Sequence, residues 1–163
     1  MKKLIKWGLI LAALCALGVL PFKATDVAEL LPVRTVIVTR SGRELTVDVG
    51  AGVRAVGKTL SEALRTLRQE VTGEVFFQTA EQIVVAEDAQ DAVPQVVNEP
   101  SFRPAAGLYL TEDADADPEE LADYLHTHAS DTTLTQARAA LLSGREPELP
   151  ILRRSHGGWR VVR

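Results

Sequence analysis

The stretch that decides the fold is GAGVRAVGKTLSEALRTLRQEVTGEVFFQTAEQIVVAED, residues 50–88. It contains a glycine-marked turn, the most amphipathic helix pattern in the sequence, and then two runs of β-forming residues. Apolar residues recur in the helix at intervals of three and four, which predicts one buried stripe: Leu60, Ala63, Leu64, Leu67 and Val71. We therefore expect a helix that packs against a sheet.

Capping residues mark both ends of this helix. Thr59 is followed three residues later by Glu62, which is the spacing of a capping box. Gly73 occupies the position of a C-terminal glycine, so the predicted helix spans residues 59–72. After it, Phe76-Phe77 and Ile83–Ala86 predict strands, and the second run is too apolar for an exposed edge.

The flanking segments complete a mixed α/β (α+β) prediction. Residues 25–31 indicate a short helix that ends at Pro32. Strands over residues 33–39 and 44–49 flank a turn and predict a β-hairpin. A hairpin, a helix and a strand in this order favour a crossover onto one sheet. The later predicted elements are residues 88–98 as a helix or a loop, 107–111 as a strand, a helix beginning at Asp117-Pro118, a helix over 135–142, and short strands over 149–152 and 159–162.

The first 23 residues have the pattern of an export signal. Lys2, Lys3 and Lys6 precede an uncharged run from Trp7 to Phe22, as in a signal peptide or a signal-anchor helix. Because the lysines lie mainly before this run, the positive-inside rule predicts a cytoplasmic N-terminus. We therefore expect one extracytoplasmic domain, residues 24–163, held at the membrane by residues 1–23.

Cys15 is the only cysteine, so an intramolecular disulfide is excluded. It lies inside the apolar run, and packing within the anchor is the preferred interpretation. Lipidation of Cys15 after cleavage is the alternative, although Leu14 is larger than the residue that should precede a lipidated cysteine.

The charge of the predicted domain is acidic. Four of the 18 basic residues are lysines within the first 23 positions, so residues 24–163 carry 14 basic and 22 acidic side chains, a net charge of −8. Such a surface argues against nucleic acid and against wrapping onto anionic lipid.

Residues 52–59 match the phosphate-loop formula G-x-x-x-x-G-K-T through Gly52, Gly57, Lys58 and Thr59. In that motif backbone amides surround a phosphate, and the lysine and threonine reach the γ-phosphate and Mg²⁺. The preceding strand alternates in polarity, and the residues between the glycines are bulky. We therefore prefer a turn and a helix N-cap, with nucleotide binding as the lesser alternative.

Other groups with catalytic or metal-binding chemistry are poorly arranged. His126 and His128 would point to different faces of a helix and would not converge on one metal ion. The acidic run over residues 112–120 lacks the glycine and the spacing of a calcium loop, so it is interpreted as the charge of a helix start. Ser155-His156 has no placed acidic partner. We therefore predict a protein that is not an enzyme and that needs no cofactor or metal.

Short segments along the chain occur in an order that resembles one protein family. They resemble the N-terminal domain of the Ger(x)C spore-germination proteins, the C subunits of bacterial germinant receptors. In chain order these segments are Asp26–Leu30 (D-x-x-E-L), a hairpin over 33–49, Gly57–Leu64 (G-K-T-x-x-E-A-L), Phe76-Phe77, Gln82–Glu87, Asn98–Arg103 and Leu142–Pro150.

The resemblance implies a non-enzymatic protein on the outer face of the cytoplasmic (inner spore) membrane, with other membrane subunits of a germinant receptor as partners. The sequence differs from the family in three ways: Leu14 precedes the cysteine, no WDR-like start follows it, and a further C-terminal domain is lacking. We therefore expect either a truncated relative or a divergent anchored paralogue. The alternative from another class is a generic envelope or sporulation scaffold protein.

Overall fold

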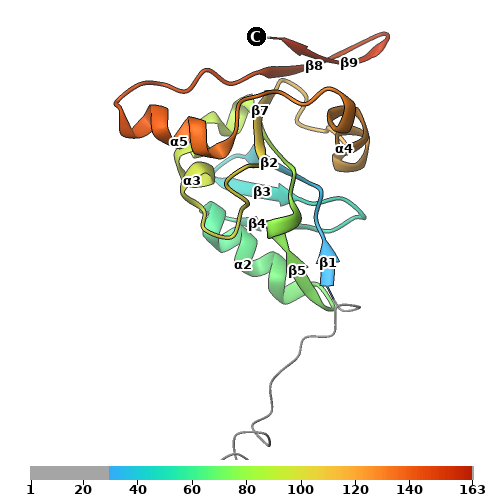
Figure 1. Ribbon diagram of the computed structural model, residues 1–163. Coiled ribbons are helices and arrows are strands. Elements are labelled where there is room, and N and C mark those ends of the chain that lie inside the picture. Colours follow the sequence, from blue (N-terminus) through green and yellow to red (C-terminus); the bar gives the residue numbers. More distant parts are fainter. Residues whose placement is uncertain (1–29, 163) are drawn as a thin grey trace, which may run out of the picture.

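The computed structural model describes residues 30–162 and shows a mixed α/β protein (Figure 1). Helices pack on both faces of a seven-stranded mixed sheet, which agrees with the fold class expected from the sequence. The predicted signal or anchor helix, residues 1–23, and Cys15 lie outside the described residues. The elements are β1 (Leu30–Pro32), β2 (Thr35–Ser41), β3 (Glu44–Asp48), β4 (Arg54–Gly57), α2 (Leu60–Glu70), β5 (Glu74–Phe76), η2 (Phe77–Thr79), β6 (Gln82–Ala86), η3 (Glu87–Ala92), α3 (Val93–Asn98), β7 (Gly107–Thr111), α4 (Pro118–Thr127), α5 (Leu134–Leu142), β8 (Ile151–Ser155) and β9 (Gly158–Val162).

The strands of the large sheet lie in the order β4-β3-β2-β6-β7-β8-β9. The central strands β2, β6, β7 and β8 are parallel and follow one another in chain order, and antiparallel strands flank them. Strands β6 and β7 are buried along their whole length because helices cover both of their faces. Since the order of the parallel strands never reverses, this sheet lacks the topological switch point at which doubly wound sheets bind ligands.

One face of the sheet packs against α2, α3 and α5. The predicted stripe of α2 faces this core, and its first four residues are each at most 1% exposed: Leu60, Ala63, Leu64 and Leu67. The strands contribute alternate residues to the same core, among them Val36, Val38, Leu45, Val47, Ile83 and Val85. This arrangement confirms the predicted packing of the helix on a sheet.

The opposite face packs against α4 and the C-terminal hairpin. Ile37, Val84 and Tyr109 point from the strands toward this side, and Leu121 and Leu125 cover them from α4. Leu152 of β8 and Trp159 of β9 complete the cluster. Leu152 and Trp159 therefore attach the hairpin to this face, while the neighbouring Ile151 packs against the core on the opposite face of the sheet.

The start of α2 was predicted correctly, and its end was placed two residues too late. Val71 is the C-cap and is extended, with φ −88° and ψ 134°, so the fifth residue of the predicted stripe lies beyond the helix. Gly73 has φ 108°, but it stands one position further along the chain than the usual C-terminal glycine. The β-branched pair Val71-Thr72 explains the earlier end, because branched side chains disfavour the helical backbone.

Two pairings differ from the sequence prediction. Leu30–Pro32 forms a strand parallel to Glu74–Phe76, so the predicted helix over residues 25–31 is wrong at its C-terminal end. Phe77 begins a 3₁₀ turn and does not continue the strand of Phe76. Pairing between segments more than 40 residues apart leaves no mark in a local pattern, which is why this small sheet was missed.

Strand β4 was also missed, because its residues were assigned to the turn before α2. It pairs antiparallel with β3 and extends the β2–β3 hairpin into three strands. Its alternation is clear in the structure: Arg54 and Val56 are exposed, and Ala55 and Gly57 are buried. Four residues are too few to show this alternation convincingly in a sequence.

The elements after β6 follow the prediction closely. Residues 88–98 take the helical alternative, as η3 and then α3 with Pro94 in its first turn. Asp117 caps α4 through a hydrogen bond from the Glu119 N–H. Helix α5 begins at Leu134, one residue before the predicted start, after a capping box of Thr133 and Gln136. The two tail strands form a hairpin, β8 and β9.

Candidate functional site

The residues of the phosphate-loop formula lie in a turn, a strand and a helix cap. Gly52, with φ 74°, belongs to the turn before β4, and Gly57 is the last residue of that strand. Because residues 54–57 are extended and paired with β3, their N–H groups do not converge on one point as a phosphate loop requires.

The same segment is fully explained as the start of α2. The Thr59 hydroxyl accepts a hydrogen bond from the Glu62 N–H at 3.2 Å, and the Glu62 carboxylate accepts one from the Lys58 N–H at 3.0 Å. These bonds satisfy two donors near the helix N-terminus. A Cβ at Gly57 would lie 2.4 Å from the backbone nitrogen of Ala63, so only glycine lets β4 approach the first turn of α2.

The start of α2 is also bonded to α3 and to the turn that follows it. The Leu60 N–H donates to the Gln95 side-chain oxygen at 3.0 Å. The Ser61 hydroxyl donates to Glu99 Oε2 at 3.4 Å, and Glu99 Oε1 accepts from both the N–H and the hydroxyl of Ser101. Glu99 therefore links α2 to the turn at residues 99–102.

Aromatic residues join the same region from two other segments. The rings of Phe77 and Phe102 meet edge to face, with centroids 5.8 Å apart and an interplanar angle of 71°. The Arg68 guanidinium carbon lies 5.2 Å from the centroid of the Phe77 ring. Three of the segments that carry the family resemblance, 57–64, 76–77 and 98–103, thus form one packed unit.

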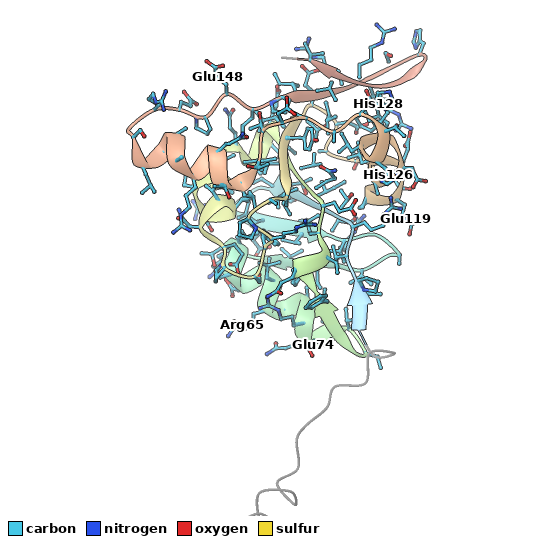
Figure 2. The ribbon with its side chains drawn as sticks, in the orientation of Figure 1. Arg65, Glu74, Glu119, His126, His128 and Glu148 are labelled. Atoms are coloured by element: carbon cyan, nitrogen blue, oxygen red, sulfur yellow. The ribbon has the colours of Figure 1, made fainter. Side chains whose placement is uncertain are left out.

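His126 lies in the last turn of α4, and His128 is the C-cap that follows this helix (Figure 2). The His128 ring stacks on Tyr124, with centroids 4.4 Å apart and planes 7° from parallel. His128 Nδ1 lies 2.8 Å from the Thr127 hydroxyl and 3.0 Å from the Tyr124 carbonyl oxygen, so its contacts are those of a helix end. Within residues 30–162, no group of three or more His, Cys, Asp or Glu side chains is placed to hold a metal ion.

The acidic run over residues 112–120 has two structural uses. Asp117 caps α4, as expected for helix-start charge. Glu112 lies 2.6 Å from the guanidinium of Arg153, and Glu120 lies 3.1 Å from that of Arg154. The run therefore also holds the C-terminal hairpin, an interaction between segments about 40 residues apart that the sequence did not reveal. In the turn of that hairpin, the Ser155 hydroxyl donates to the Gly158 carbonyl oxygen at 3.0 Å.

Hollows in the surface surround the loop between α4 and α5. One of about 530 Å³ is lined by Ser130, Asp131, Thr132, Gln136, Glu148, Leu149 and Pro150. This lining contains carboxylates but no basic side chain, so it offers no charge to bind an anion.

A smaller hollow of about 260 Å³ lies under the end of α4 and includes Gln82, Gly107 and His126. Gln82 is 7% exposed, and its buried Oε1 has no hydrogen-bond partner among residues 30–162. An ordered water in this hollow would satisfy it.

Tyr109 is a buried titratable group beside this hollow. It is fully buried, and its hydroxyl oxygen accepts a hydrogen bond from the Ser130 N–H at 2.8 Å. Burial raises the pKa of Tyr109 above its usual value of 10.0, because desolvation disfavours the phenolate. Its role is to fix the loop at Ser130 to the sheet.

No family model, curated protein or solved structure matches this chain. Between residues 30 and 162, no helix has the length and apolar character needed to cross a membrane.

Proposed function

We propose that this chain is a non-enzymatic, membrane-anchored extracytoplasmic protein that acts in spore germination as a C-subunit-like component of a germinant receptor. Its mixed α/β domain lies on the outer face of the cytoplasmic (inner spore) membrane and contacts other receptor subunits. The observation that carries the proposal is the ordered set of segments that resemble the Ger(x)C family, preceded by an export signal.

Packing among these segments supports the proposal. The G-K-T-x-x-E-A-L segment has a structural reason at most of its positions: a close approach at Gly57, a cap at Thr59 and Glu62, and core positions at Ala63 and Leu64. Such residues preserve a fold and need no bound ligand. A resemblance at these positions is therefore one of architecture, as expected for a protein that acts through its surface.

The charge of the chain points to the same kind of partner. A net charge of −8 over residues 24–163 disfavours nucleic acid and anionic lipid. Protein subunits of the membrane are compatible with this charge. The proposal therefore concerns protein–protein contacts and involves no catalytic step.

Deletion of the gene tests the proposal. We expect slower or absent germination, measured as release of dipicolinate, and loss of partner subunits from the inner spore membrane. The wild-type gene and the Lys58→Ala variant should both restore germination, because the Lys58 side chain is exposed and only its backbone contacts Glu62. Normal germination and normal receptor assembly in the deletion strain would refute the proposal.

Crosslinking in sporulating cells separates this proposal from its main alternative. Receptor subunits should be recovered with the chain if the proposal is right. Cell-wall or coat components in their place would indicate an envelope scaffold. Mass spectrometry of the mature N-terminus would show whether residues 1–23 are retained, cleaved, or replaced by a lipid on Cys15.

A further inference from the structure

The C-terminal hairpin extends past the sheet from which it starts. Strand β8 pairs with β7 at only two positions, Leu110↔Ile151 and Thr111↔Leu152. It pairs with β9 at five positions, so residues 153–160 form a two-stranded ribbon beyond the end of β7. Figure 1 shows this ribbon at the opposite end of the molecule from β1, where the described chain begins.

Strand β9 is an edge strand, and its outer side has no neighbour within residues 30–162. The register places Ser155 opposite Gly158 next to the two-residue turn. Pairs of antiparallel residues alternate between hydrogen-bonded and non-bonded types, so the backbone groups of Trp159 and Val161 point away from β8. These groups are available to another strand, and such an edge readily pairs with one.

The hairpin is basic and the rest of the domain is acidic. Residues 151–163 contain four arginines and no acidic residue, which leaves ten basic and 22 acidic residues in 24–150. Arg153 and Arg154 are ion-paired with the run that precedes α4. Arg160 faces Arg153 across the hairpin, is exposed, and has no ion pair within residues 30–162.

We propose that the β9 edge binds an extended, acidic segment of another protein by strand addition. The backbone groups of Trp159 and Val161 would pair with the added strand, and Arg160 would select acidic side chains on it. This inference rests on the proposed function in one respect, that the domain acts through contacts with other proteins.

A second copy of this chain is a poorer occupant of the edge. Antiparallel pairing of two β9 strands about their centre brings the two copies of Arg160 close together. Like charges on directly opposite strand positions destabilise the pairing. The acidic partner avoids this repulsion and gains an attraction in its place.

Peptide binding to the full chain in detergent micelles tests the inference. The probes are two fluorescein-labelled peptides, EVTVEVTV and KVTVKVTV, measured by anisotropy at low salt. We expect the acidic peptide to bind and the basic peptide to fail. Hydrogen exchange should slow at the amides of Trp159 and Val161 when the acidic peptide is added.

Two variants and a control locate the site. Arg160→Glu should weaken binding of the acidic peptide by about tenfold, because an attraction becomes a repulsion. Val161→Pro removes an outward N–H and should abolish binding. Arg65→Glu changes another exposed arginine, on α2 and far from the hairpin (Figure 2), and should leave binding unchanged. If Val161→Pro fails to fold, the effect of Arg160→Glu alone decides whether the acidic peptide binds at the β9 edge.

Several results would overturn the inference. These are no binding of the acidic peptide up to about 1 mM, equal binding of both peptides, or equal effects of Arg160→Glu and Arg65→Glu. A dimer by light scattering that Val161→Pro converts to a monomer would assign the edge to a second copy. Binding to phosphatidylglycerol vesicles in place of the peptide would assign it to lipid.

Peptide binding and germination are measured independently, so the two proposals can fail separately. Acidic-peptide binding together with normal germination and normal receptor assembly in the deletion strain would support strand addition at β9 and refute the receptor role. A germination defect together with no peptide binding would support the receptor role and refute strand addition at β9.

Discussion

The contact between β4 and α2 yields the sharpest prediction, the effect of Gly57→Ala. A Cβ at this position would lie 2.4 Å from Ala63 N, 2.9 Å from Ala63 Cα and 2.9 Å from the Glu62 carbonyl carbon. All three atoms belong to the backbone of α2, so no side-chain rotation relieves the overlap. The helix must move away from the sheet, and the buried stripe of α2 moves with it.

The size of the effect follows from this geometry. Overpacking in a well-packed core costs about 1–3 kcal/mol, and a clash with backbone belongs at the upper end of that range. Alanine in place of glycine also restricts the unfolded chain, which returns about 0.4–1 kcal/mol. We expect a net loss of about 2 kcal/mol in the free energy of unfolding, or about 6 °C in Tm for a domain of this size.

Urea and thermal unfolding of the full chain, followed by circular dichroism, measure this loss. Gly157→Ala is the matched control, because a Cβ at Gly157 meets nothing within 4 Å. The control should stay within about 0.5 kcal/mol of the wild type. Equal stability of Gly57→Ala and the control would show that β4 does not approach α2 as closely as described. The structural explanation of Gly57 would then be wrong as well.

Three further predictions concern the cap, the phosphate-loop formula and the buried tyrosine. Thr59→Ala should lower stability by about 1 kcal/mol through loss of the N-cap, and Thr59→Ser should restore most of it, as measured by urea unfolding. Lys58→Ala should leave stability within about 0.5 kcal/mol of the wild type, and isothermal titration with Mg-ATP or Mg-GTP should detect no binding to either protein. A nucleotide affinity that disappears with Lys58→Ala would contradict our interpretation. Burial raises the pKa of Tyr109 in the folded state, so the neutral hydroxyl stabilises the folded protein fully below pH 10. This stabilisation is lost as the pH rises further. Thermal melts at alkaline pH should therefore show a smaller loss of stability for Tyr109→Phe than for the wild type.

The prediction of α2 succeeded because its signals are local. An apolar spacing of three and four fixes the buried face, and a threonine three residues before a glutamate fixes the start. The end was misplaced because Val71 leaves the helix to connect with β5, which pairs with a distant strand. The same reason explains the missed strands β1 and β4, whose stability depends on partners and not on their own residues.

The candidate site shows the same division. The sequence showed that Gly57, Lys58 and Thr59 could begin a helix or hold a phosphate, and the pattern alone allowed both. Pairing of β4 with β3 and the approach of Ala63 to Gly57 favour the first interpretation. Two side-chain contacts could not be predicted from residue spacing, because they join segments far apart in the sequence. They are the hydrogen bond between Ser61 and Glu99 and the ion pair between Glu112 and Arg153.

The sequence by itself therefore determined the amphipathic helix, the buried strand after it, the N-caps of α2 and α4, and the mixed α/β class, because each depends on neighbours within a few residues. Only the tertiary structure decided that Gly57 is a point of contact between β4 and α2, and that a basic hairpin stands as an open edge on an acidic domain. Both depend on which distant segments pair and pack, and the few residues of a short strand do not by themselves specify its partner.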